Sequence, residues 1–164
     1  MVTVKRKDFE KIDDASLIWM CIEPTIKEIR GKNLAVKQEV YASLNTGLQA
    51  LLMFQVLYGH TFNGVEEFYT HLSYLLSNDG VWSQLERGMQ YFGDMAMVEI
   101  LQKMHVLFLS INTEKSNNAP GQYAELSKKM MLINESLSKT MPLTIKLVAA
   151  YIRNNKDEYM QVAD

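Results

Sequence analysis

Apolar residues recur at intervals of three and four along this chain, from Leu17 to Ile152, and this spacing constrains the fold more than any other feature. An α-helix turns once every 3.6 residues, so the spacing gathers apolar side chains on one helical face. No segment alternates apolar and polar residues for long enough to indicate a strand, and only three prolines interrupt the pattern. The spacing therefore predicts an all-α protein, an irregular bundle of about six or seven helices.

The chain is expected to form one domain. Its 164 residues are a usual length for a single domain, and no internal repeat divides it. The one clear polar loop, residues 113–121, is too short to link two domains. Beyond that loop, Pro142 is expected to divide the last helical stretch in two. We expect a single helical domain over residues 1–164, with residues 1–12 and 156–164 frayed at its ends.

Capping residues and helix breakers indicate where the first helices begin and end. Asp13 or Asp14 can cap the first helix, because a short side chain with an oxygen accepts a hydrogen bond from a free amide at a helix start. Pro24 either kinks this helix or opens a second short one that runs through Ile29 and ends at Gly31. The next segment, residues 34–58, is the longest, and we expect it to be the central helix.

Similar signals mark the middle of the chain. Gly47 lies inside the long helix at a cost of about 1 kcal/mol. Asn63, followed by Glu66 and Glu67, is typical of a helix start, where a side-chain oxygen meets free amides and carboxylates meet the positive end of the helix dipole. Further on, Gly93 can end a short helix in the left-handed conformation, and the Asp residue after it can cap the next helix.

The charge balance excludes several functions. The chain has 17 basic and 19 acidic residues, a net charge of -2, and shows no cluster of Lys and Arg of the kind that binds nucleic acid phosphates. Residues 41–112 hold only two basic and six acidic side chains, which indicates that the helices there are mostly core. No window reaches the roughly eighteen apolar residues of a membrane span. We expect neither nucleic-acid binding nor membrane insertion.

A single cysteine, Cys21, stands among Trp19, Met20 and Ile22. It cannot form an internal disulfide, and its apolar neighbours favour burial over reactivity. The basic residues near the start of the chain are followed by acidic residues and not by the apolar core of a signal peptide. We therefore expect a protein of the reducing cytoplasm.

Three histidines, His60, His71 and His105, are the candidate metal ligands. Glu67 and His71 lie four residues apart, which favours simple contact on one helical face, and the chain contains no His-x-x-x-His pair. Cys21 and the serines lack the glycine context of a nucleophile elbow. We predict no metal, no cofactor and no enzymatic activity. The alternative is a small helical enzyme or ligand-binding bundle with a site near His71 and His105.

Residues 62–69 (FNGVEEFY) follow the long helix, and Gly93 closes the short helix further on. With these features, residues 40–108 resemble the DNA-mimic-protein-like family, small bacterial all-helical proteins known as a domain of unknown function. The glycines, first aromatic, glutamine and aromatic pair of that family's signature fall, in order, on Asn63, Gly64, Val65, Glu67, Phe68 and Tyr69. The resemblance implies the helical fold and a protein-binding role. Mimicry of DNA itself needs rows of carboxylates, which 19 acidic against 17 basic residues do not supply.

We interpret the chain as a protein-interaction module whose partner is another protein or a second copy of itself. Tyr and Trp concentrate at interfaces, because each combines a large apolar ring with one polar atom. The candidate contact residues form an aromatic and acidic face: Phe62, Glu66, Glu67, Tyr69 and Trp82. Met95 and Met131 lie off the main apolar rows and can extend an exposed patch. Because these side chains exceed what the helical stripes require, the sequence predicts a homodimer.

Overall fold

The computed structural model describes residues 2–72, 79–114 and 122–163. Seven α-helices of seven residues or more lie within these residues, so the predicted all-α bundle is confirmed. The elements, in order, are β1 (Val2–Lys5), α1 (Arg6–Phe9), α2 (Asp14–Ile29), α3 (Leu34–Ser43), α4 (Thr46–Thr61), α5 (Val65–Leu72), α6 (Asp79–Tyr91), α7 (Met95–Glu114), α8 (Gln122–Asn154), the 3-10 helix η2 (Lys156–Glu158) and β2 (Met160–Ala163).

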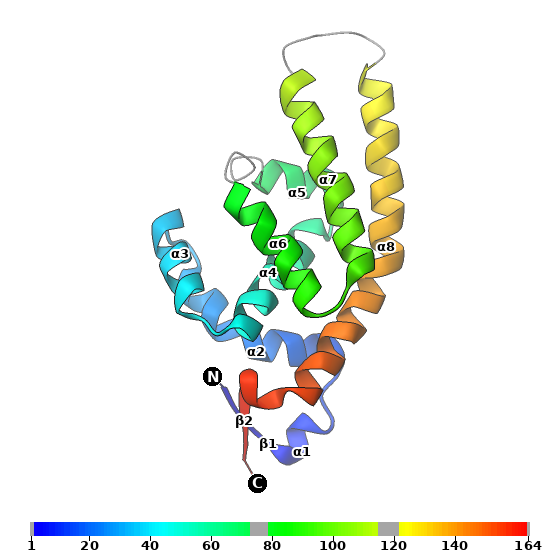
Figure 1. The fold of residues 1–164 in the computed structure, drawn as a ribbon. Helices are drawn as coiled ribbons and strands as arrows, with labels where there is room; N and C mark the ends of the chain where they lie inside the picture. The colour runs from blue at the N-terminus through cyan, green and yellow to red at the C-terminus, as the bar shows by residue number, and fades with distance from the viewer. Residues whose placement is uncertain (1, 73–78, 115–121, 164) are drawn as a thin grey trace.

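Helix α4 lies in the middle of the bundle, as Figure 1 shows. Helices α7 and α8 run side by side in opposite directions as the longest pair, and α2 passes beneath α4. The two strands lie together at the end of the molecule where both termini are found (Figure 1). One buried apolar cluster includes residues from both strands and from α2 and α4 to α8.

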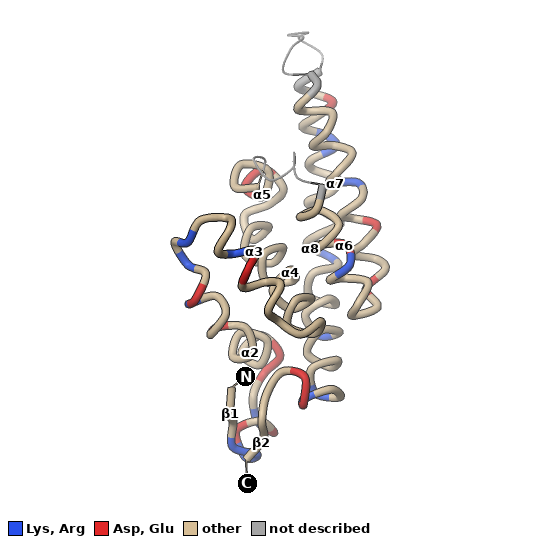
Figure 2. The backbone as a smooth tube through the Cα atoms, turned by 60° about the vertical axis from the view of Figure 1, so that its left-hand side comes forward, with Lys and Arg blue, Asp and Glu red and all other residues tan. Residues whose placement is uncertain are grey.

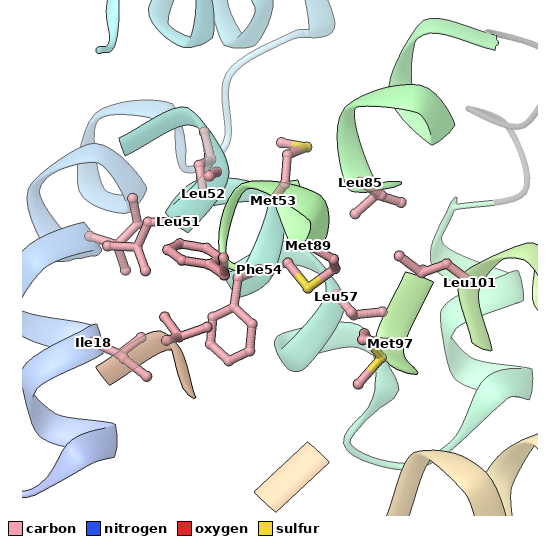
Figure 3. Packing of buried hydrophobic residues seen from close by; sticks show 14 of the residues in the cluster. Ile18, Leu51, Leu52, Met53, Phe54, Leu57, Leu85, Met89, Met97 and Leu101 are labelled. Atoms are coloured by element: carbon pink, nitrogen blue, oxygen red, sulfur yellow. The ribbon is translucent and has the colours of Figure 1, made fainter. Parts of the chain in front are cut away.

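The core is built around α4, which is buried on several sides. Leu51, Phe54 and Leu57 of this helix are fully buried, and Met89 of α6 and Leu101 of α7 pack into the same cluster (Figure 3). A helix that is apolar around most of its circumference can only be stable inside a bundle. The prediction that residues in this part of the chain form the central helix is therefore confirmed for α4.

Helices α4 and α6 cross at short range because small residues meet there. A Cβ atom built on Gly88 would lie 3.0 Å from Met53 Cβ and 3.3 Å from the Ala50 carbonyl oxygen. Any larger side chain at the glycine would push the two helices apart. The crossing thus explains a glycine in the interior of α6, where it lowers helix propensity.

The expectation that residues 1–12 and 156–164 are frayed is wrong for the residues among them that the structure describes. Strands β1 and β2 pair in parallel, with Val2 opposite Met160 and Val4 opposite Val162. Tyr159 and Met160 are fully buried, so these two residues are part of the core. The strands were not predicted because each has four residues, too few for an alternating pattern to stand out.

The expected long helix over residues 34–58 is two helices, α3 and α4, with a break at Asn45. The Asn45 side chain accepts a hydrogen bond from the Leu48 N–H (2.8 Å) and donates one to the Glu158 carbonyl oxygen (2.8 Å). Gly47 is therefore near a helix start, not in the interior. A Cβ atom there would lie 2.6 Å from Glu158 Oε2 and 2.9 Å from the Tyr159 hydroxyl oxygen, so glycine makes room for η2 and the residue after it.

The two interior prolines do not end their helices. Pro24 lies inside α2, and Pro142 lies inside α8, so the predicted division of the last helical stretch at Pro142 is wrong. Proline in a helix interior costs about 3 kcal/mol. Leu137 and Val148, on either side of Pro142, are both buried in the common core, and packing of both halves offsets that cost.

Two of the predicted caps are confirmed and carry further contacts. Asp13 Oδ1 accepts the Ser16 N–H (2.9 Å), which makes Asp13 the cap of α2. Asp94 Oδ1 accepts the Met97 N–H (2.9 Å) at the start of α7, and its Oδ2 accepts the Thr144 hydroxyl of α8 (2.5 Å). Gly93 has φ +77°, the left-handed conformation expected of it. The predicted polar loop, by contrast, lies largely outside the described residues.

Candidate protein-binding groove

Two neighbouring hollows open along one side of α8. The first has a volume of about 400 Å³ and lies between α2, α4 and α8; it is lined by Ala15, Ser16, Ile18, Trp19, Phe54, Gln55, Tyr58 and Ile145. The second has a volume of about 620 Å³ and is lined by Tyr58, Thr61, Phe62, Asn63, Gly64, Met131, Asn134, Glu135, Leu137, Ser138 and Met141. Tyr58 borders both, and Met141 and Ile145 lie one helical turn apart on α8. The two neighbouring hollows are together called here the α8 groove.

Phe62 lines the second hollow of the α8 groove and, at 79%, is the most exposed of the large apolar side chains that the structure describes. Its backbone continues α4 in the helical conformation (φ -57°, ψ -40°). The hydroxyl of Thr61 donates to the Leu57 carbonyl oxygen (2.8 Å), and the Gly64 N–H donates to the Thr61 carbonyl oxygen (2.9 Å). The exposed ring is thus carried on a fixed backbone and not on a loose loop.

The turn after Phe62 is fastened to α8. The Val65 N–H, at the start of α5, donates to Asn134 Oδ1 (2.8 Å). The expected cap, Asn63, makes no such bond in the structure; the oxygen comes from a residue 69 positions further along the chain. Gly64 has φ +103°, and a Cβ atom there would lie 3.0 Å from the same Asn134 oxygen. This position therefore needs glycine for both its backbone conformation and its close approach.

The α8 groove is almost free of charge. Among the residues that line the two hollows, Glu135 is the one charged side chain, and its Oε1 lies 2.6 Å from Lys139 Nζ. The hydrogen bond from Lys139 lowers the pKa of Glu135, so this carboxylate stays ionised and paired. Helix α4, which forms one wall, contains no Lys, Arg, Asp or Glu (Figure 2). The groove can therefore accept an apolar surface without leaving an unpaired charge beneath it.

The other aromatic candidates lie elsewhere. Trp82 is buried, and its ring contacts Phe68 and Phe108 at centroid distances of 6.1 and 5.9 Å. Tyr69 is half-buried, with its ring 5.1 Å from Phe108 and its hydroxyl donating to Asn112 Oδ1 (2.7 Å). These rings join α5, α6 and α7 into an aromatic cluster inside the bundle. Of the three aromatic residues proposed for contact, only Phe62 lines the groove.

The acidic candidates lie on α5. Glu66 is exposed. Glu67 is half-buried; its Oε1 lies 3.6 Å from His71 Nε2, and its Oε2 is buried without a hydrogen-bond partner. Neither carboxylate lines the groove, so the structure does not bring the five candidate residues together on one face.

The histidines form two separate contacts. His60 lies beside His71, with ring centroids 5.2 Å apart, whereas His105 stacks on Trp82 at 4.7 Å. Burial lowers the pKa of His60, and the nearby His71 adds to this shift while Glu67 opposes it. Within the described residues, no three His, Cys, Asp or Glu side chains are grouped so that they could hold a metal ion.

A cluster of tyrosines around Glu158 connects α6, α8 and the 3-10 helix η2. The Tyr91 hydroxyl donates to Glu158 Oε2, and the Tyr91 ring lies 5.1 Å from that of Tyr151. Burial raises the pKa of both Tyr91 and Tyr159, so these phenols stay protonated. Burial also raises the pKa of the Cys21 thiol to about 12, which makes it a poor nucleophile. None of these groups borders either hollow.

Comparisons with protein-family models, with characterised proteins and with solved structures found no match for this chain. The resemblance to the DNA-mimic-protein-like family stays a prediction. None of the described helices combines the length and the apolar character that crossing a bilayer requires.

Proposed function

We propose that this protein works by binding another protein chain along the α8 groove. The observation that carries the proposal is the exposure of Phe62. Its ring is 79% exposed, lies on the ordered turn after α4 and borders the second, largely apolar hollow. Burying such a ring on binding contributes about 1.5 to 3 kcal/mol. Because the backbone is already held by Asn134, little conformational entropy is lost when the partner arrives.

Three other exposed apolar side chains of α8 are less suited to this role. Leu132, Leu143 and Leu147 lie on the outer side of α8, where exposed lysines such as Lys139 and Lys146 stand among them. Lysine stems cover apolar surface while their charges stay in water, so this face is compatible with solvent. No lysine or arginine lines the α8 groove, where Lys139 only pairs with Glu135, and this supports the groove as the binding surface.

An enzyme or ligand-binding bundle with a site near His71 and His105 is the alternative function. It has less support, because His71 contacts His60 while His105 stacks on Trp82, and no histidine lines either of the two hollows. We therefore propose a binding role without catalysis. The single, buried Cys21 is consistent with a reducing compartment, and we propose the cytoplasm as the place of action.

The test is capture of partners by the tagged protein in its own host, carried out in parallel with matched variants. Phe62→Asp and Met131→Asp place a charge in the groove, whereas Val106→Asp places the same charge on α7 at a side chain that is 69% exposed and outside the groove. We expect the captured proteins to be lost with both groove variants and kept with Val106→Asp. Capture that is unchanged by both groove variants, with their melting temperatures preserved, would contradict the proposal.

A further inference from the structure

We infer that the free edge of β1 binds an extended, acidic segment of a partner protein, which joins the two-stranded sheet as a third strand. In a sheet of two strands, each strand has one edge without a neighbour. Alternate residues point their backbone N–H and C=O groups towards that edge, and an extended peptide pairs with them. The inference does not rest on the proposed function, because no residue of β1 lines the α8 groove.

The edge of β1 is open in the folded chain. In the part of the chain that the structure describes, the backbone of Val2, Thr3 and Val4 makes no hydrogen bond outside the sheet that it forms with β2. Figure 2 shows no other element beside β1 on the side that faces away from β2. A partner strand can therefore approach to the spacing of about 4.8 Å that neighbouring strands keep.

The backbone of β1 is held in place before a partner binds. Val4 is buried in the common core and Val2 packs against that core, so one face of the strand is fixed. Pairing with β2, in which Thr3 lies opposite Gln161, fixes the backbone along the other edge. Little conformational entropy of this chain is lost when a third strand joins such an ordered strand.

The two faces of β1 define which side chains the partner strand carries. Side chains alternate between the faces of a sheet, so every second partner side chain lies beside Val2 and Val4, and the others lie beside Thr3 and Lys5. The first set should be apolar, because it continues the face that packs on the core. The second set lies on the exposed face and should be polar.

The charge of β1 indicates that these polar side chains are acidic. Lys5 ends the strand, is exposed and is followed by Arg6 and Lys7, and Asp8 offsets only one of these three positive charges. Side chains of opposite charge on neighbouring strands stabilise their pairing. The segment that fits the edge therefore alternates apolar and acidic residues.

The edge of β2 suits such a segment less well. Its exposed side chains, Gln161 and Ala163, carry no charge. Asp157 and Glu158 come shortly before the strand, and these carboxylates would repel an acidic partner. Charge therefore assigns the partner to β1.

Nuclear magnetic resonance tests the inference with a defined probe, a short peptide in which valine alternates with aspartate. The ¹⁵N-labelled protein is titrated with this peptide to millimolar concentration, and separately with a peptide in which lysine replaces aspartate. We expect saturable shifts of the amide signals of residues 2–5 with the acidic peptide and weaker binding of the basic one. Unchanged signals of residues 2–5, or equal affinity for both peptides, would overturn the inference.

A charge reversal tests the role of Lys5. Lys5→Glu should weaken binding of the acidic peptide about fivefold and strengthen binding of the basic one. Lys146→Glu makes the same change at an exposed position of α8 and is the matched control, which should leave both affinities unchanged. Equal effects of the two variants would assign the preference to net charge and overturn the placement at β1.

Methylation of the peptide backbone tests the strand pairing itself. The N–H groups of alternate residues in an extended peptide point to opposite edges, so N-methylation of either all valines or all aspartates blocks the edge that faces β1. We expect one methylated peptide to lose binding and the other to keep it. Binding of both would overturn the inference. Shifts of residues 2–5 that depend on protein concentration without peptide would show a second copy on this edge and would also overturn it.

Discussion

The two ends of α4 differ in how their side chains are covered: those at the start pack against the rest of the chain, whereas the Phe62 ring after the last residue is exposed. At its start, the Asn45 side chain donates to the Glu158 carbonyl oxygen, and Gly47 packs closely against the side chains of Glu158 and Tyr159. At its far end the backbone is held as firmly, by the bond from Val65 to Asn134, yet the Phe62 ring is left outside. If Phe62 lay on a frayed loop, the backbone around it would lack these hydrogen bonds. If Phe62 were a core residue, its ring would be buried. The proposed binding role rests on this combination of a fixed backbone and an exposed ring.

The largest effect should come from filling the space at the start of α4. Gly47→Ala places a Cβ atom 2.6 Å from Glu158 Oε2 and 2.9 Å from the Tyr159 hydroxyl oxygen. We expect a loss of about 2 kcal/mol in the free energy of unfolding, measured in urea, because overpacking outweighs the gain in helix propensity. Gly59→Ala is the matched control in the same helix, since its nearest contact would be Gln55 Nε2 at 3.8 Å. It should be neutral or raise stability, and equal effects at both glycines would show that the start of α4 is not tightly closed.

Removing the hydrogen bond between the turn after α4 and Asn134 should have the next largest effect. Asn134→Ala takes away the oxygen that accepts the Val65 N–H, so we expect a loss of about 1 kcal/mol in stability. Association should weaken as well, because Phe62 is no longer held in place. Ser138→Ala, at another residue of the groove whose hydroxyl bonds only a carbonyl oxygen of its own helix, is the control. Weaker stability with unchanged association would mean that a fixed corner is not needed for binding.

A smaller effect concerns pH. The pKa of His60 is below its ordinary value in the folded protein, so between that pKa and about 6.5 the unfolded chain binds more protons. His60 therefore makes stability greatest above the unfolded pKa and lower as the pH falls through the folded one. We expect the melting temperature to fall between pH 7.5 and pH 5.5, and to fall less in His60→Gln. A parent and variant with the same pH dependence would assign the fall to other groups.

The smallest expected effect is that of metal removal. The pair of His60 and His71 does not form a metal site with any third described ligand, so we expect a chelator to leave the melting temperature unchanged. Added zinc should not raise it either. A rise that is lost in His71→Ala would revive a metal-dependent function at this corner.

Sequence reasoning succeeded where a structural signal is local. The Asp94 cap and the left-handed Gly93 depend on residues within three positions of each other, and both were predicted. It failed where the determining partner is far along the chain. From the sequence, Gly47 was expected to destabilise a helix interior, because its close approach to Glu158 cannot be seen there. Likewise, Asn63 was expected to cap α5, but the capping oxygen belongs to Asn134.

The candidate site follows the same rule. Met131 was identified from the sequence because it lies off the main apolar rows, and Phe62 because it belongs to the predicted aromatic and acidic face. Tyr58 and Met141 fit ordinary helical stripes, and only the packing of α4 against α8 shows that they border a hollow. Trp82 was assigned to the exposed face because its sequence neighbours do not reveal the rings of Phe68 and Phe108 that bury it.

The parallel pairing of β1 with β2 has a consequence for folding. Val2 lies opposite Met160, so this small sheet can form only after the intervening helices have brought the two strands together. A contact between such distant residues carries the largest loop-closure entropy, and we expect it to form after the folding transition state. Weakening it, for instance at the buried Val4, should therefore accelerate unfolding and leave the folding rate nearly unchanged. The sheet would then control the unfolding rate, and with it the lifetime of the folded bundle, but not the folding rate.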